Sequence, residues 1–226
     1  GDYLIMKKLI HVLNINDFFP ELFALTFPTI QAYAERHGFQ INLITQRKFP
    51  DYPINYEKMQ VYEDGKEAQL NMLCDADMLI HPHFPDVETF VDPTHAAFND
   101  NYNISHKYQV NRIPYFIRDG RDIGIATNCV VTSNLTHDLW EPLSLTSQQI
   151  ADLAVPNNDE PNEYNRGWGH YADEFALSFN LARYGLKYQG ICPLDWQRPY
   201  LIHVGTGDKE RSLRVARETL VKWATL

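Results

Sequence analysis

Two acids, Asp75 and Asp77, stand inside the otherwise apolar stretch LNMLCDADMLIHPHF, residues 70–84. A carboxylate in apolar surroundings is costly unless it is paired or bound to a cation. Residues two apart in a strand share a face, so both carboxylates are expected to leave the carboxyl end of one strand together. Open α/β sheets bind ligands at that edge, and hard divalent ions prefer oxygen ligands. The pair therefore predicts a Mg²⁺ or Mn²⁺ site carrying a diphosphate; the alternative is a turn whose acids cap the next segment.

The elements that must position these acids alternate between strand and helix in the first part of the chain. The expected strands are 7–15, 39–45 and 68–80, and the expected helices are 17–37 and 56–64. Pro28 is expected to kink the first helix or divide it in two, and Gly38 to end it. The third strand is apolar almost throughout, which predicts a place near the middle of the sheet. This alternation predicts an α/β fold with a mostly parallel sheet covered by helices.

The second part of the chain has weaker patterns. Residues 82–110 are polar and aperiodic, which predicts a loop or lid rather than a core element. Strand-like pieces follow within 122–134, then an amphipathic helix at 170–184, a strand at 199–207 and a closing helix at 209–223. Without an internal repeat or a long linker, we expect one domain, 1–226, with a nucleotide-binding half at about 7–80 and an acceptor-binding and catalytic half at about 81–226.

Composition narrows the function classes. The 226 residues carry a formal charge of −9, which disfavours nucleic acid and anionic lipid as partners. Three cysteines, Cys74, Cys129 and Cys192, lie among apolar residues without metal-finger spacing, which predicts reduced core thiols and a cytoplasmic location. No segment reaches the roughly 18 apolar residues that a membrane span requires.

The strand–helix–strand opening, the helix containing YEKM and the apolar strand ending in DADML together resemble the GT-A glycosyltransferases. The resemblance implies a single-domain GT-A (Rossmann-like) α/β/α sandwich with a mostly parallel, mixed central sheet. In this family a D-x-D motif binds the metal and the diphosphate of a nucleotide-sugar donor. Asp77 would be the direct metal ligand, Asp75 would reach the ribose and share the metal, and Lys58 would contact the donor; the alternative for Lys58 is a solvated helix lysine.

The segment GWGHYADEF, residues 167–175, is similar to the W-G-x-E-D type segment of many inverting members of the family. The similarity implies that Trp168 and Gly169 shape the acceptor site and that an acid at the next helix N-terminus is the catalytic base. A helix N-terminus stabilises an ionised carboxylate, as proton abstraction requires. Asp173 is the first choice. Three residues separate the glycine from the acids, unlike the commoner family spacing, so Glu174 stays open as the base. The alternative is that these acids only cap the helix.

The segment LIHVGTGDK, residues 201–209, loosely resembles a late strand of glycogenin-like members, with one extra residue before the lysine. The resemblance implies that His203 is the third protein ligand of the metal, and nitrogen ligation suits Mn²⁺ better than Ca²⁺. It also implies that Gly205 and Lys209 contact the diphosphate. The alternative for His203 is a structural histidine on an apolar strand.

Three asparagines complete the expected donor site. Asn128 matches a family position near the donor sugar, while Asn14 and Asn16 follow the first strand where the base and ribose are usually held. Polar residues at these positions also close turns and cap helices, so both roles stay open.

These features predict a metal-dependent, hexosyltransferase-like glycosyltransferase that moves a sugar from a nucleoside-diphosphate donor, foremost a UDP-sugar, to an acceptor hydroxyl on a glycan. Inversion is the first expectation and retention the alternative. The competing functions are a nucleotidyltransferase, which the absence of glycine in HVLNINDFF disfavours, and a non-catalytic nucleotide-sugar-binding domain. The alternative acceptor is a hydroxymethylated nucleobase in DNA.

Overall fold

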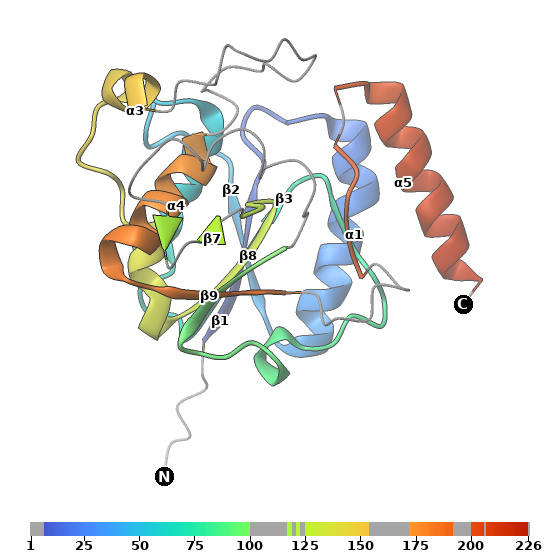
Figure 1. Cartoon of the computed structure of the whole chain (residues 1–226). Helices are drawn as coiled ribbons and strands as arrows, with labels where there is room; N and C mark the ends of the chain where they lie inside the picture. Colours follow the sequence, from blue (N-terminus) through green and yellow to red (C-terminus); the bar gives the residue numbers. More distant parts are fainter. Residues whose placement is uncertain are drawn as a thin grey trace.

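The computed structural model describes residues 7–99, 117–118, 121–122, 125–153, 172–191, 200–205 and 207–225. A six-stranded sheet in the order β2-β1-β3-β8-β5-β9 forms its centre (Figure 1). The strands are β1 (Lys8–Leu13), β2 (Gln40–Ile44), β3 (Leu70–Asp75), β5 (His95–Phe98), β8 (Cys129–Ser133) and β9 (Lys187–Gly190). β8 runs antiparallel to both of its neighbours, and the other neighbouring pairs are parallel. The sheet is therefore mixed and mostly parallel, as expected.

Two short ribbons accompany this sheet. The strands of the first, β4 (Met78–Ile80) and β10 (Leu201–His203), pair antiparallel, as do β6 (Ile117–Arg118) and β7 (Arg121–Asp122) in the second. The β4–β10 ribbon matters for the site because it brings the segment after β3 next to the segment that precedes α5 (Lys209–Ala224).

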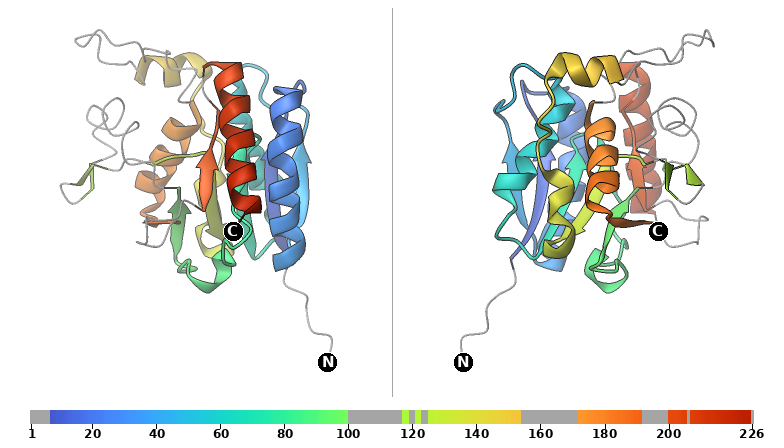
Figure 2. Two further views of the ribbon diagram at one scale, coloured as in Figure 1. Left: turned by 90° about the vertical axis from the view of Figure 1, so that its right-hand side faces the viewer. Right: turned by 60° about the vertical axis from the view of Figure 1, so that its left-hand side comes forward.

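Helices cover both faces of the sheet. The α-helices are α1 (Pro20–His37), α2 (Val61–Asp64), α3 (Ser147–Leu153), α4 (Ala172–Tyr184) and α5 (Lys209–Ala224), and the 3₁₀ helices are η1 (Ile54–Gln60), η2 (Val87–Thr89) and η6 (Asn134–Trp140). Figure 1 shows α1 and α5 on one side of the sheet and α3 and α4 on the other, and Figure 2 shows α1 and α5 side by side. The result is an α/β/α sandwich. None of the described helices is long and apolar enough to cross a membrane.

The alternating side chains of β3 fill both layers of the core. Met72 packs with Ile30 of α1 in one apolar cluster, whereas Leu73 packs with Phe175 of α4 in the other. Because successive residues of a strand point to opposite faces, a strand with helices on both sides must be apolar almost throughout. The central position predicted for this strand is confirmed.

Three local expectations need correction. α1 runs unbroken through Pro28, so the predicted division of this helix is wrong: its buried side chains, among them Leu22 and Ile30, hold both halves against the sheet. The strand expected over 68–80 ends at Asp75. After a turn the chain forms β4, which pairs with β10 outside the six-stranded sheet. Within the polar region after Pro82, residues His95–Phe98 form β5 between β8 and β9, so that region is not only a loop.

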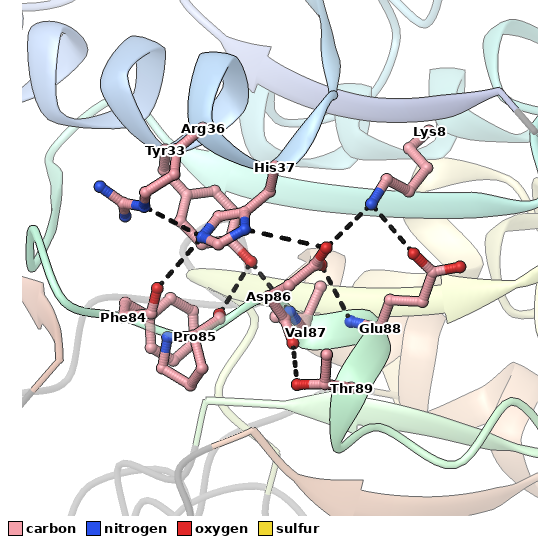
Figure 3. Close-up of polar contacts among 10 residues, drawn as sticks. All are labelled: Lys8, Tyr33, Arg36, His37, Phe84, Pro85, Asp86, Val87, Glu88 and Thr89. Atoms are coloured by element: carbon pink, nitrogen blue, oxygen red, sulfur yellow. Dashed lines mark hydrogen bonds and ion pairs between the residues drawn. The ribbon is translucent and has the colours of Figure 1, made fainter.

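A polar cluster closes the amino end of the sheet (Figure 3). Nζ of Lys8, the first residue of β1, lies 2.9 Å from Oδ2 of Asp86 and 3.0 Å from Oε2 of Glu88. His37, the last residue of α1, places Nδ1 3.8 Å from the same Asp86 oxygen. We call Lys8, His37, Asp86 and Glu88 the amino-end cluster; it ties the start of β1, the end of α1 and the segment around η2 together.

Candidate metal and donor site

Asp75, Asp77 and His203 converge at the carboxyl end of β3. β3 ends at Asp75, the chain turns through Ala76 and Asp77, and β4 then pairs with β10, which sets His203 opposite Met78. The N–H of Val204 donates to the carbonyl oxygen of Asp77 at 3.0 Å. One ligand atom from each member of the triad lies within 4.8 Å of the others, and Nε2 of His203 is 3.2 Å from Oδ1 of Asp77. The acids meet through a turn rather than through the strand pleat expected from their spacing.

Close packing fixes this turn from two sides. The hydroxyl of Thr26 on α1 donates to the carbonyl oxygen of Ala76 at 2.5 Å. On the other side, a Cβ placed on Gly205 would lie 1.8 Å from Oδ2 of Asp77 and 3.2 Å from Nε2 of His203. Gly205 therefore allows the chain after β10 to approach the triad, and any larger residue would displace the carboxylate of Asp77.

The site shifts the pKa values of its titratable groups. Burial raises the pKa of Asp75 to about 6, despite the opposing pull of Lys58. Burial also acts to raise the pKa of Asp77, but the hydrogen bond and charge of His203 outweigh it, so that pKa is lowered. Burial acts to lower the pKa of His203, and the partner Asp77 raises it overall. Perturbed carboxylates beside an imidazole at a sheet edge are typical of functional sites.

Lys58 on η1 is buried beside this triad. Its Nζ lies 2.7 Å from Oδ1 of Asp75 and 2.7 Å from Oδ2 of Asp173, and it donates to the carbonyl oxygen of Thr127 at 3.0 Å. Burial acts to lower the pKa of Lys58, but the charges of Asp173 and Asp75 outweigh it and raise that pKa. The alternative of a solvated helix lysine is wrong, because Lys58 is 3% exposed.

Asp173, in the first turn of α4, accepts further hydrogen bonds. The hydroxyl of Thr127 donates to its Oδ2 at 2.7 Å, and Nδ2 of Asn55 donates to its Oδ1 at 2.8 Å. Sequence reasoning missed both donors. Asn55 stands one helical turn before Lys58 and Thr127 directly before Asn128, but nothing in their local sequence indicates that they meet Asp173.

The residues after β1 lie at the same edge of the sheet, because Leu13 pairs with Asp75. The N–H of Asn14 donates to the carbonyl oxygen of Ile44 at 2.9 Å. Its side-chain Oδ1 is buried and has no hydrogen-bond partner in the described part of the chain. Asn16 is exposed and has a φ of 58°, in the left-handed region. A buried acceptor without a partner beside strained backbone fits a position where a ligand supplies the missing donor.

The other predicted donor and acceptor residues have different surroundings. The carbonyl oxygen of Asn128 accepts from the N–H of Asp75 at 2.8 Å, and its side-chain Oδ1 accepts from Nδ2 of Asn99 at 3.0 Å. Lys209 begins α5 and places Nζ 5.1 Å from the ring centre of Phe19, in the loop after β1. Glu174 is half-buried in the first turn of α4. Trp168 and Gly169 lie outside the described residues.

No protein-family model matches this sequence, and no curated protein matches it. Among solved structures, a glycosyltransferase involved in the glycosylation of the major capsid of PBCV-1 is similar over 93% of this chain and 99% of its own, with a TM-score of 0.54 and 11% identity. This chain has a GT-A fold. A mutant of Drosophila β-1,4-galactosyltransferase 7 in complex with manganese, UDP-Gal and xylobiose covers 89% of this chain and 72% of its own, with a TM-score of 0.45 and 12% identity.

Within the GT-A fold, the donor set of the triad fits a divalent cation. Two carboxylates and one imidazole supply the oxygen and nitrogen ligands that Mn²⁺ accepts. Asp75, Asp77 and Asp173 bring three negative charges and Lys58 brings one positive charge, so the cluster carries a surplus of two negative charges when His203 is neutral. A divalent cation would neutralise this surplus.

Proposed function

We propose that this protein is a metal-dependent glycosyltransferase that transfers a sugar from a nucleoside-diphosphate sugar, with a UDP-sugar as the first donor to test, to a hydroxyl group of a glycan. The observation that carries the proposal is the convergence of Asp75, Asp77 and His203 at the carboxyl edge of a GT-A sheet. The glycosyltransferase similar in fold over nearly the whole chain supports it.

Asp75, Asp77 and His203 would hold Mn²⁺ or Mg²⁺, with the bound metal supplying charge neutralisation for the leaving diphosphate. Asn14 and Asn16 would hold the nucleoside, since the buried Oδ1 of Asn14 offers an acceptor to a base or ribose donor. Gly205, packed against Asp77 and His203, would offer its main chain to the diphosphate. Asn128 and Lys209 would contact the donor sugar and the diphosphate, and for Lys209 this requires its ammonium to leave the ring of Phe19.

The acceptor hydroxyl must lose a proton as it attacks the donor sugar. We assign Glu174 as the base that accepts this proton. Asp173, the first choice from the sequence, already accepts hydrogen bonds from Lys58, Thr127 and Asn55. Glu174 is half-buried, and it shares with Asp173 the helix N-terminus that stabilises an ionised acid. With Glu174 as base, the reaction inverts the anomeric centre. Trp168 and Gly169 would shape the acceptor site.

A thermal-shift panel tests the donor. Nucleoside diphosphates and their sugars, with and without Mn²⁺, should raise the unfolding temperature only when the metal is present, because a ligand that binds the native state stabilises it by RT ln(1 + [L]/Kd). The Asp77→Asn variant should show no such shift. If no nucleoside diphosphate shifts the wild-type protein with Mn²⁺, the proposal fails.

Product analysis then separates the alternatives. A glycosyltransferase releases the nucleoside diphosphate when the sugar is transferred to the acceptor. Without an acceptor, it releases the diphosphate slowly as the sugar is transferred to water. Release of pyrophosphate from a nucleoside triphosphate would instead indicate a nucleotidyltransferase. Metal-dependent binding without any release would indicate a non-catalytic binding domain. Transfer from the donor to a panel of glycans, with hydroxymethylated DNA as a further arm, would define the acceptor.

A further inference from the structure

The ammonium group of Lys58 is surrounded by acceptors of the protein. It has three hydrogens and three acceptors within 3.0 Å: Asp75, Asp173 and the carbonyl oxygen of Thr127. Two of these contacts are hydrogen bonds, to Asp173 and to Thr127, and the third is an ion pair with Oδ1 of Asp75; since Lys58 is 3% exposed, protein groups enclose its ammonium. Lys58 therefore has a role in holding protein groups rather than in touching the substrate.

Asp173 is equally occupied. Its Oδ2 accepts from Lys58 and Thr127, its Oδ1 accepts from Asn55, and the residue is 3% exposed. An acceptor hydroxyl has little access to a carboxylate that is buried and bonded through both oxygens. Asp173 does, however, form an ion pair with Lys58, whose Nζ also lies 2.7 Å from Oδ1 of Asp75.

We propose that Lys58 and Asp173 are positioning residues for the metal site: Asp173 is the counter-ion of Lys58, and Lys58 holds Asp75 with its remaining acceptor capacity turned toward Asp77 and His203. The proposal rests on the proposed function for the use of the metal. Groups that orient metal ligands typically change metal affinity or activity by roughly 10- to 100-fold when they are mutated. Through Lys58, Asp75 of β3 is also linked to Asp173 of α4, the helix that carries Glu174.

The Asp173→Asn variant tests this role by Mn²⁺ titration, with free Mn²⁺ measured by electron paramagnetic resonance and no donor present. With Asp173 neutral, Lys58 keeps one anionic partner instead of two, so its less compensated positive charge competes more strongly with the metal for Asp75. Mn²⁺ affinity should fall roughly 10-fold or more. In turnover, the donor KM at limiting Mn²⁺ should rise, and saturating Mn²⁺ should restore most of kcat.

The opposite result would overturn the proposal. If Asp173 is the base, D173N should keep wild-type Mn²⁺ affinity while kcat falls about 10²- to 10⁴-fold at saturating metal. Unchanged Mn²⁺ affinity alone is enough to reject the positioning role.

Three further variants control for charge and for folding. Lys48 and Asp64 form a matched pair with the same 2.7 Å separation, but their side chains are 51% and 26% exposed, so Asp64→Asn removes one acid with no expected effect on Mn²⁺ affinity. Lys58→Gln leaves two buried carboxylates without their cation and should lower the unfolding temperature. Adding Asp173→Asn to it should recover part of that loss, because one of the unpaired charges is removed. A double variant less stable than Lys58→Gln alone would contradict the assignment of Asp173 as counter-ion.

Failure of this inference is distinguishable from failure of the proposed function. If wild-type protein binds Mn²⁺ but transfers no sugar, the function is wrong, and the Mn²⁺ affinity of D173N still decides the positioning role. If wild-type protein binds no Mn²⁺, both are rejected.

Discussion

The two ends of the sheet carry clusters built from nearly the same residue types. The amino-end cluster has one lysine, one histidine and two acids (Figure 3). The carboxyl-end cluster, Lys58, Asp75, Asp77, Asp173 and His203, has one lysine, one histidine and three acids. With both histidines counted as neutral, the surplus is one negative charge at the amino end and two at the carboxyl end.

Burial and convergence, rather than residue type, separate a structural clamp from a candidate metal site. At the amino end, Lys8 pairs with both acids, and the side chain of Glu88 is 44% exposed, so water solvates the residual charge. At the carboxyl end, Lys58 and Asp173 are almost fully buried, and Asp77 is 7% exposed. An uncompensated charge costs far more in such surroundings. A bound cation would therefore stabilise the carboxyl-end cluster more than the amino-end cluster.

The sharpest test of this difference removes one acid from each cluster. Asp77→Asn takes a ligand and a charge from the triad, so Mn²⁺ binding should be lost and sugar transfer should fall by about 10³-fold or more, as expected when several kcal/mol of metal stabilisation disappears. Asp86→Asn at the amino end should leave Mn²⁺ affinity and kcat within about twofold of wild type. Mn²⁺ titration and steady-state turnover on both variants check this. Equal losses in the two variants would contradict the assignment of the metal to the carboxyl end.

Replacing one glycine at each end of the sheet tests the same difference between the two ends by steric means. Gly205→Ala forces a methyl group to within 1.8 Å of the Asp77 carboxylate unless something moves. Mn²⁺ affinity should fall roughly 10- to 100-fold, because the ligand is displaced while its chemistry is kept. Gly38→Ala, at the end of α1, meets nothing within 4 Å and has a φ of 72°, so it should cost about 1 kcal/mol of stability through backbone strain alone. Wild-type Mn²⁺ affinity in Gly205→Ala would show that the loop after β10 moves aside freely.

At the amino end, the expected loss is one of stability. Besides its contact with Lys8, Asp86 accepts a hydrogen bond from the N–H of Glu88 as the N-cap of η2. Its replacement by Asn removes a half-buried ion pair and weakens the cap, so the free energy of unfolding should fall by about 1–2 kcal/mol. Urea denaturation measures the loss. A stability unchanged within error would mean that the clamp in Figure 3 contributes nothing measurable.

Local patterns in the sequence were sufficient for the elements whose own residues determine them. Apolar runs predicted β1, β2 and β3, helical spacing predicted α1, α4 and α5, and the acid pair located the triad. β5 was missed because HAAF is short and lies in a polar region; its pairing with β8 and β9 makes it a strand. The turn after Asp75 was missed because no glycine or proline marks it.

The contacts of Asp173 were out of reach of sequence reasoning for a different reason. Lys58 and Asp173 stand 115 positions apart, and each looks like an ordinary charged residue of a helix. Only the packing of η1 against α4 brings them together, beside the main chain of Thr127. Sequence reasoning therefore found the candidate metal ligands but could not foresee the hydrogen bonds that Asp173 accepts from Lys58 and Thr127.

His11 lies on β1 between the two clusters. It is a buried polar residue whose neutral ring has hydrogen-bond partners. Its Nε2 lies 2.8 Å from Oδ1 of Asn71 and its Nδ1 3.0 Å from Nδ2 of Asn42. Burial lowers the pKa of His11 below the ordinary 6.5. The unfolded chain therefore binds a proton at a higher pH than the folded protein does. The stabilisation is complete above about pH 6.5 and is lost as the pH falls from there toward the folded pKa, by at most about 1.4 kcal/mol per pH unit.

Urea unfolding at pH 7.5 and 5.5 measures this loss, and comparison with variants isolates it from other titrating groups. His11→Gln should be less stable than wild type at pH 7.5, since a buried hydrogen-bonded ring is lost, but it should lose less stability between the two pH values. His83→Gln is the matched control, because His83 is exposed and its replacement should keep the wild-type dependence. If His11→Gln loses as much stability between the two pH values as wild type does, His11 is not the proton-binding group. The proposed contrast between the charged ends and the uncharged middle of the sheet would then be wrong.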